Sequence, residues 1–267
     1  MLSPPQTPAY RVLVLKTDKL CAEMMRQAAQ RVFPAAAIHV VARIDHAARV
    51  LELGPADLML AGIELGDADA LDFLMANIGS RLVRRTMLVT SRHDQRVLIA
   101  LKSLPLDGVF DPSSEGVATL EHALRVVSAG KCYFSPSALQ RLQQHCCDAM
   151  SICRLLTRTE QLVLAVIGDG CDDEAAARWL DLKPATVQSV RRAIHHKLGV
   201  QHRGELVRVA IQHGFVRLTP EGIRRAGLGT IHSACCACRT GGPHRGGVLR
   251  AVASSGNPAA VAEASIV

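Results

Sequence analysis

Aromatic side chains are scarce in this sequence: Phe, Trp and Tyr make up 3% of its 267 residues, whereas hydrophobic residues make up 49%. The cores must therefore consist mainly of aliphatic side chains, and the length suggests two domains rather than one. No apolar run reaches the ~18 residues that a membrane span needs, and the N-terminus lacks a signal-peptide pattern. We therefore expect a cytoplasmic protein without a membrane partner.

Enzyme signatures are missing as well. The sequence has no G-x-G-x-x-G fingerprint, no P-loop and no nucleophile elbow, so we predict neither enzymatic activity nor a cofactor. Its nine cysteines are an odd number, which excludes a complete disulfide framework. Two interpretations stay open for three of them, a redox contact between protomers or ordinary packing: Cys146, Cys147 and Cys153.

Five further cysteines and histidines gather near the C-terminus, namely His232, Cys235, Cys236, Cys238 and His244. Three thiolates and an imidazole would suit zinc. An adjacent pair of cysteines is not a recurring zinc spacing, however, and no predicted element presents these ligands. We therefore predict no metal and interpret the group as free thiols.

Positive charge is in excess, with a net charge of +7 and a pI near 9.1, which is compatible with a polyanionic partner. The most informative segment runs from Pro184 to Leu198. At ~100° per residue, one side of a helix carries Val187, Val190, Ile194 and Leu198. The other side carries Gln188, Ser189, Arg192, His195 and His196. The segment alone allows two interpretations, a solvated surface helix or a helix that enters a DNA groove.

The residues on either side favour the second interpretation. Thr157 with Glu160 predicts a capped helix start, and the segment from Asp172 to Leu180 predicts another helix with acids in its first turn. A turn at 181–183 leads to Pro184, which suits the first position of a helix. Two short helices joined by a tight turn are the helix-turn-helix arrangement, and a last helix is expected at about 203–213.

The whole region resembles the LuxR-type DNA-binding domain of bacterial regulators. The resemblance rests on Leu156-Thr157, Glu160, Val163-Leu164, Gly170, Ala177, Leu180, Pro184, Thr186-Val187, Ile194, Lys197-Leu198-Gly199-Val200, Arg203 and Glu205-Leu206. It implies four helices, of which the third enters the major groove and the fourth makes a dimer contact. The implied base contacts are Gln188, Ser189 and Arg192. The expected phosphate contacts are Lys183, Thr186, Arg191, His195, His196 and Lys197, and the expected dimer contacts are Leu206, Val209 and Ala210.

Some residues depart from the family pattern. Lys183 stands where the family has a capping Ser or Thr, and losing that cap costs ~1 kcal/mol. The acids Asp172, Asp173 and Glu174 replace a polar or basic segment near the DNA backbone. Residues 156–216 contain eight Lys/Arg and seven Asp/Glu, so we expect modest affinity and a weak salt dependence.

The first 130 residues follow another pattern. Apolar runs of strand length lie at 12–15, 38–41, 57–61, 86–89 and 107–110, and they alternate with helical segments at 20–32, 47–53, 71–78, 94–103 and 117–129. Such alternation predicts a parallel sheet with right-handed crossovers. The order and spacing resemble the receiver domain of response regulators, with Pro55–Ile63 as its third strand and Thr90-Ser91 ending its fourth.

The resemblance implies a phosphoacceptor aspartate, two metal-binding acids and a lysine, and this sequence lacks all of them. Gly62 stands at the acceptor position, Lys16-Thr17 at the acid pair, and Asp111-Pro-Ser-Ser114 where the lysine belongs. Only the hydroxyl of Thr90 remains. We therefore expect no aspartyl phosphorylation, because neither the nucleophile nor the magnesium ligands are present.

Other residues of this region have two interpretations. The acids Asp18, Glu64, Asp67 and Asp69 either hold a cation loosely or serve loop solvation and helix capping. The segment 94–110 is the interface that the resemblance implies, with Val97, Leu98, Leu101 and Leu104 as its apolar residues. The alternative is that these four belong to the core.

The fold class expected is α/β followed by all-α, with a receiver-like (βα)5 domain (1–130), a linker with a connecting helix (131–155), a four-helix DNA-binding domain (156–217) and a disordered tail (218–267). The sequence predicts a dimeric transcription regulator that binds double-stranded DNA. RNA polymerase or a related regulator is a further candidate partner. The alternative function is a protein-interaction regulator whose DNA-binding surface has decayed and which sequesters a relative.

Overall fold

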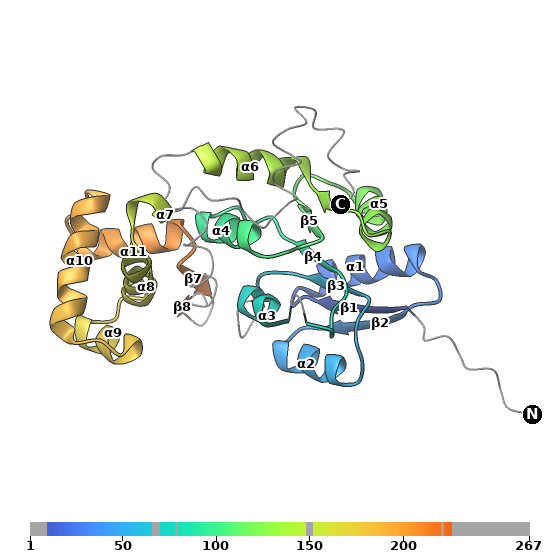
Figure 1. The fold of residues 1–267 in the computed structure, drawn as a ribbon, viewed down its shortest axis with the longest axis horizontal. Coiled ribbons are helices and arrows are strands. Elements are labelled where there is room, and N and C mark those ends of the chain that lie inside the picture. Colours follow the sequence, from blue (N-terminus) through green and yellow to red (C-terminus); the bar gives the residue numbers. More distant parts are fainter. Residues whose placement is uncertain (1–9, 66–69, 78–79, 148–151, 220–221, 226–267) are drawn as a thin grey trace, which may run out of the picture. The chain divides into compact units, whose positions relative to one another are not determined.

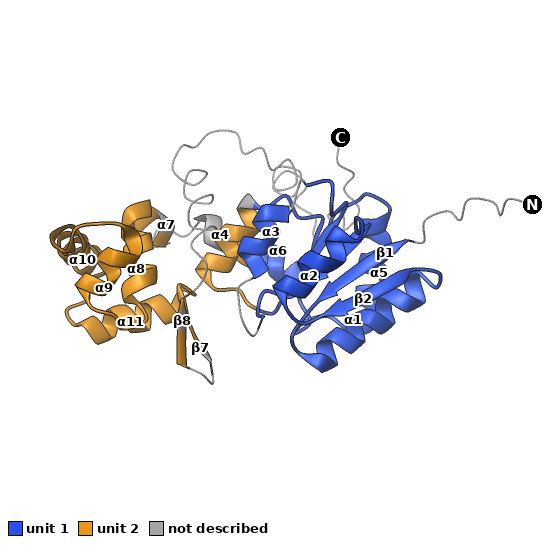
Figure 2. Cartoon of the chain, turned by 90° about the horizontal axis from the view of Figure 1, so that it is seen from below, with its two compact units in different colours: residues 1–91, 104–140, 246–267 blue, residues 92–103, 141–245 orange. Residues whose placement is uncertain are grey.

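The computed structural model of the protein describes residues 10–65, 70–77, 80–147, 152–219 and 222–225. These residues group into two compact units, coloured in Figure 2: the first holds the described residues of 1–91 and 104–140, and the second those of 92–103 and 141–245. Among the described residues, no helix combines the length and the apolar character that crossing a membrane would require.

The first unit is built on a parallel sheet of six strands in the order β2-β1-β3-β4-β5-β6. The strands are β1 (Arg11–Leu15), β2 (Ala37–Val41), β3 (Leu58–Ala61), β4 (Thr86–Val89), β5 (Gly108–Phe110) and β6 (Tyr133–Phe134). The first five confirm the predicted strands, whereas β6 was not predicted. Since Leu15 of β1 pairs with Ala61 of β3, the carboxyl ends of these strands bring Lys16 beside Gly62.

Helices cover both faces of this sheet (Figure 1). Their bounds are α1 (Lys19–Val32), α2 (Ile44–Glu52), α3 (Ala70–Asn77) and α5 (Val117–Ser128). Val12 and Val14 of β1 pack with α1 and α5 in one core. Leu13 and Leu15, which alternate with them along the strand, are equally buried on the opposite face. Each large aliphatic side chain so buried stabilises the fold by about 1.5–3 kcal/mol.

The second unit is mainly helical, with a short hairpin at its end. It contains α4 (Gln95–Ser103), α7 (Ile152–Leu155), α8 (Arg158–Ile167), α9 (Asp173–Leu180), α10 (Pro184–Leu198), α11 (Arg203–Gln212), β7 (Val216–Thr219) and β8 (Gly222–Arg225). Helix α6 (Pro136–Cys147) starts in the first unit and ends in the second. It lies within the predicted linker and matches the connecting helix expected there, and its Leu139 and Leu142 are buried.

The hairpin corrects one prediction. Residues 218–225 were expected to belong to a disordered tail, yet β7 and β8 pair in antiparallel register, with Leu218 opposite Ile223. The pairing forms because β7 begins inside the core of the second unit, where Val216 is 1% exposed. The cysteine and histidine group at 232–244 lies outside the described residues, as do the side chains of Cys146, Cys147 and Cys153.

The apolar residues of the segment 94–110, predicted as an interface, are buried in the structure. Val97, Leu98, Leu101 and Leu104 are all buried, with at most 8% of each residue exposed. Their burial favours the alternative interpretation, in which these four residues belong to the core. Helix α4 is held within the second unit by hydrogen bonds, since the Ile152 amide donates to Gln95 Oε1 at 2.8 Å.

Candidate nucleic-acid interface

Helix α10 lies at the margin of the bundle formed by α8 to α11 (Figure 1). Its apolar side belongs to the core of the second unit: Val187 and Ile194 are fully buried, and Val190 and Leu198 pack against the same cluster. The helical wheel predicted this side correctly. Because the core holds this side of α10, the helix can present its polar side without losing its position.

The elements before α10 set its position. The Thr157 hydroxyl accepts a hydrogen bond from the Glu160 amide, and the Glu160 carboxylate accepts one from the Thr157 amide. This reciprocal cap confirms the predicted start of α8. Helix α9 ends at Asp181, whose φ of 53° is left-handed, and Pro184 occupies the first turn of α10. The turn between α9 and α10 is therefore as tight as the sequence predicted.

Helix α10 starts without a side-chain cap. Lys183 is its N-cap residue and accepts no hydrogen bond from the first turn, as expected from its lack of an acceptor. The ammonium group of Lys183 is left at an exposed position. A cation at a helix N-terminus interacts unfavourably with the helix dipole, so Lys183 destabilises the start of α10. The same exposed ammonium group is available to an anionic partner.

The three expected base contacts occupy one exposed surface. Gln188, Ser189 and Arg192 are all exposed, and they follow one another along the polar side of α10. Gln can read adenine and Arg can read guanine through two hydrogen bonds each. The geometry therefore allows these three side chains to meet base edges together.

The expected phosphate contacts divide into two groups. Lys183, Thr186, His196 and Lys197 are exposed, whereas Arg191 and His195 are half-buried. His195 Nδ1 lies 2.8 Å from the carbonyl oxygen of Val200, which can only accept, so Nδ1 carries a hydrogen and donates a hydrogen bond to this carbonyl just beyond the end of α10. Only Nε2 of His195 is then left for another partner.

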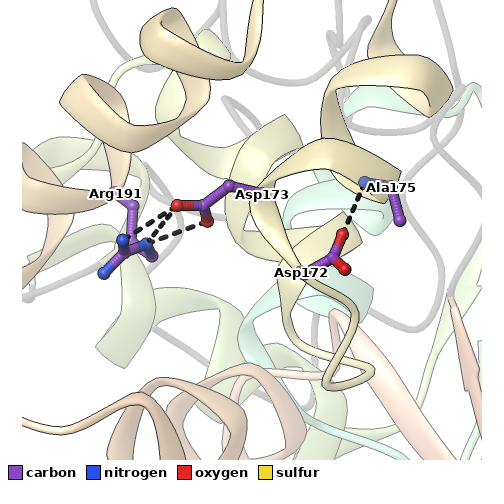
Figure 3. A network of polar contacts seen from close by, with 4 residues as sticks. All are labelled: Asp172, Asp173, Ala175 and Arg191. Atoms are coloured by element: carbon purple, nitrogen blue, oxygen red, sulfur yellow. Dashed lines mark hydrogen bonds and ion pairs between the residues drawn. The ribbon is translucent and has the colours of Figure 1, made fainter.

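Arg191 is held by a carboxylate from the preceding helix (Figure 3). Its Nε lies 3.0 Å from Oδ1 of Asp173, and its Nη2 lies 2.9 Å from Oδ2. These hydrogen bonds, opposed by partial burial, hold the pKa of Asp173 below its ordinary value. The neighbouring Asp172 has another role, because its Oδ1 accepts from the Ala175 amide at 2.7 Å and caps α9.

Lys197 is also paired. Its Nζ lies 2.8 Å from Oε2 of Glu160, the same oxygen that accepts from the Thr157 amide at 2.6 Å. Burial raises the pKa of Glu160, but the hydrogen bonds from Lys197 and Thr157 outweigh it and leave the pKa below its ordinary value. The pair joins the end of α10 to the start of α8, so it stabilises the bundle itself.

The residues expected at the dimer contact have different surroundings. Leu206 and Ala210 of α11 are fully buried in the core of their own unit, which removes them from any surface and corrects that expectation. Burial follows from their spacing of four residues, which puts both on the same side of α11. Val209 is half-buried and is the one residue of the three that a partner can still reach.

The position predicted to correspond to the phosphoacceptor is covered by a side chain that follows the neighbouring strand. Gly62 follows β3, and a Cβ atom added there would lie 2.6 Å from Cδ and 3.1 Å from Nζ of Lys16. The aliphatic chain of Lys16 therefore occupies the space that an acceptor side chain would need. Thr90, the remaining hydroxyl, is 6% exposed at the end of β4.

A buried carboxylate lies at the position where the resemblance predicted a lysine. Asp111 is 1% exposed, and its two oxygens accept from Ser113 Oγ at 2.6 Å and from Ser137 Oγ at 2.8 Å. In the loop between β1 and α1, Asp18 caps α1 by accepting a hydrogen bond from the Cys21 amide, in agreement with the capping interpretation. Asp67 and Asp69 lie outside the described residues.

Comparison with known proteins identifies the helical region. Residues 154–210 match the family described as "Bacterial regulatory proteins, luxR family", so this segment is a LuxR-family helix-turn-helix domain, as the sequence predicted. A structure of the RcsB response regulator of Salmonella typhimurium is similar in fold, with a TM-score of 0.51 and 16% identity over 76% of this chain and 97% of that chain. The receiver-like sheet followed by a helix-turn-helix domain is thus confirmed.

Two curated relatives have a higher sequence identity to this chain than the RcsB structure does, over a shorter part of it. The chain is 31% identical to the transcriptional regulatory protein YdfI of Bacillus subtilis (strain 168) over 49% of this chain. It is 28% identical to the transcriptional regulatory protein MctR of Rhizobium johnstonii (strain DSM 114642 / LMG 32736 / 3841) over 51% of this chain. The chain spans 63% of the length of each of these relatives.

Proposed function

We propose that this chain is a transcription regulator that binds double-stranded DNA by inserting α10 into the major groove. The observation that carries the proposal is the two-sided character of α10, with Val187 and Ile194 in the core and Gln188, Ser189 and Arg192 exposed on one surface. The names of both curated relatives as transcriptional regulatory proteins support it.

The proposal includes regulation without aspartyl phosphorylation. A receiver needs a nucleophile and oxygen ligands for magnesium at the same edge of the sheet. Here Gly62 offers no side chain and the Lys16 side chain covers it. A cation at this point repels a divalent metal, so the receiver-like unit acts as an interaction module. We further propose that the chain binds DNA as a dimer, with Val209 of α11 as a contact.

A gel-shift experiment on duplex DNA from the chain's own promoter region tests the proposal. We expect a salt-sensitive shift, and we expect Arg192→Ala to lower the affinity by roughly tenfold or more, since a bidentate base contact contributes ~1–3 kcal/mol. Arg49→Ala is the matched control, because it removes the same charge from an exposed position on α2 of the other unit. An equal loss in both variants would contradict a base-reading role for Arg192.

A second candidate function is a regulator that no longer binds DNA and instead sequesters a related regulator. The observation in its favour is that two cations of α10, Arg191 and Lys197, are already paired with carboxylates of the same unit. No shift at low salt, together with tight capture of a purified relative, would favour this function over DNA binding.

A further inference from the structure

Three consecutive acids begin α9, and the structure gives each a different role. Asp172 caps the helix, Glu174 is exposed, and Asp173 turns toward α10 to bind Arg191 through both carboxylate oxygens (Figure 3). Helix α9 packs directly against α10. Only the middle acid therefore acts on the polar side of the proposed recognition helix.

Arg191 directly precedes Arg192 in α10, but the two side chains differ in availability. Arg192 is exposed, whereas 25% of the Arg191 side chain is exposed and its partner Asp173 is covered to a similar degree at 22%. The edge of the guanidinium formed by Nε and Nη2 is occupied by Asp173. That edge is one of those through which arginine grips a phosphate with two parallel hydrogen bonds.

We propose that Asp173 is an intramolecular competitor of the DNA backbone: it occupies Arg191 in place of a phosphate and so lowers the DNA affinity of the chain. The inference rests on the proposed function. In helix-turn-helix complexes the first helix of the motif crosses the backbone, which would bring the acidic start of α9 close to phosphates. A carboxylate at this point both repels the DNA and neutralises a cation of α10.

The second ion pair of α10 does not act in this way. Glu160 is buried at 6% exposure and its Oε2 also accepts from the Thr157 amide. Its carboxylate is therefore part of the helix cap, and Lys197 joins a structural pair. Asp173 makes no such cap, because Asp172 performs that role for α9. Asp173 can thus be replaced without removing a cap, which makes the competition testable.

A double-mutant cycle on the full chain tests the proposal, with fluorescence anisotropy on a labelled duplex of mixed sequence from about 50 to about 200 mM salt. We expect Asp173→Asn to bind roughly three- to tenfold more tightly, with a salt slope steeper by ~0.9, which corresponds to one additional phosphate contact. Arg191→Ala should change little in the original chain and should remove most of the gain in the double variant, leaving only the part that comes from weaker repulsion. Asp173→Ser is the second variant if Asp173→Asn does not fold.

Glu174→Gln is the matched control, because it removes one negative charge next to Asp173 while Arg191 stays paired. A gain equal to that of Asp173→Asn would overturn the proposal in favour of general repulsion by the acids. Weaker binding by Asp173→Asn, with an equal loss in Arg191→Ala, would overturn it too, since Asp173 would then position Arg191 for contact. Unchanged affinity in Asp173→Asn overturns it as well.

Failure of the proposed function gives another result. In that case the original chain does not bind the duplex at low salt although circular dichroism shows that it is folded. No variant then restores salt-dependent binding. If instead the chain binds in an Arg192-dependent way while Asp173→Asn gains nothing, only the role of Asp173 is rejected.

Discussion

At the scale of single residues, Gly62 and Lys16 form a complementary pair across two neighbouring strands. The glycine leaves open the space that the lysine chain fills, at a projected Cβ–Cδ distance of 2.6 Å. The sequence predicted that an acceptor and a metal site are missing, but it could not predict that the side chain of Lys16 lies over Gly62. That relation depends on the pairing of β1 with β3.

This pair predicts a coupling between the two positions. Gly62→Ala should lower the free energy of unfolding by at most about 1 kcal/mol, because the new methyl group meets the outer part of the flexible Lys16 chain, which must shift to make room. In a Lys16→Ala background the same substitution should cost much less, as measured by urea unfolding. Equal costs in both backgrounds would contradict the contact.

The ion pairs show what residue patterns cannot predict. The sequence marked Asp173 as one of three acids near the DNA backbone and Arg191 as a phosphate contact, but not that they bind each other. They lie on different helices, and their contact depends on how α9 crosses α10. A periodic pattern describes one helix at a time. The cue available in the sequence was an aspartate at the start of α9 that is not needed as its cap.

At the scale of elements, caps and turns were predicted well because their chemistry is local. The Thr157 and Glu160 cap, Pro184 in the first turn of α10 and the capping role of Asp18 each involve neighbours within a few residues. The hairpin of β7 and β8 was missed for the opposite reason. Its strands have four residues each, too few for an alternating pattern to stand out beside a Gly- and Ala-rich sequence.

The uncapped start of α10 leads to a prediction at this scale. Lys183→Ser should raise the free energy of unfolding by ~1 kcal/mol, because the hydroxyl can accept a hydrogen bond from the first turn. Lys183→Ala, which removes the charge but adds no acceptor, is the control for urea unfolding. If both variants gain equally, the charge of Lys183 rather than the missing cap destabilises the helix. DNA affinity should fall in both, since each loses the same cation.

At the scale of the whole molecule, the sequence predicted both regions and their order. The five strands of the receiver-like unit were recognisable because strands buried on both faces are continuous apolar runs. The sequence did not reveal to which unit α4 belongs. Its position in the chain, between β4 and β5, suggested the unit that holds the sheet, but α4 groups with the helical unit. Local patterns place an element in the chain but do not decide its neighbours.

We expect that phosphoryl donors do not modify the chain. Incubation with acetyl phosphate and Mg²⁺ should give no stable label and should leave DNA affinity and oligomeric state unchanged, since no nucleophile lies at the end of β3. The measurements are intact mass and gel shift on the same sample. A label that persists when neighbouring acids are replaced, and disappears with one particular aspartate, would contradict this expectation.

The packing of Lys16 over Gly62 also decides what an acceptor side chain engineered at position 62 would meet first. An aspartate introduced at 62 alone would displace the flexible lysine chain and meet its ammonium group instead of a metal ion. Shortening the lysine alone would expose an edge without a nucleophile. Two acids and a distant lysine would still have to arise before metal binding brought any benefit. No single substitution at position 16 or 62 would therefore supply both the nucleophile and the metal ligands that aspartyl phosphorylation needs.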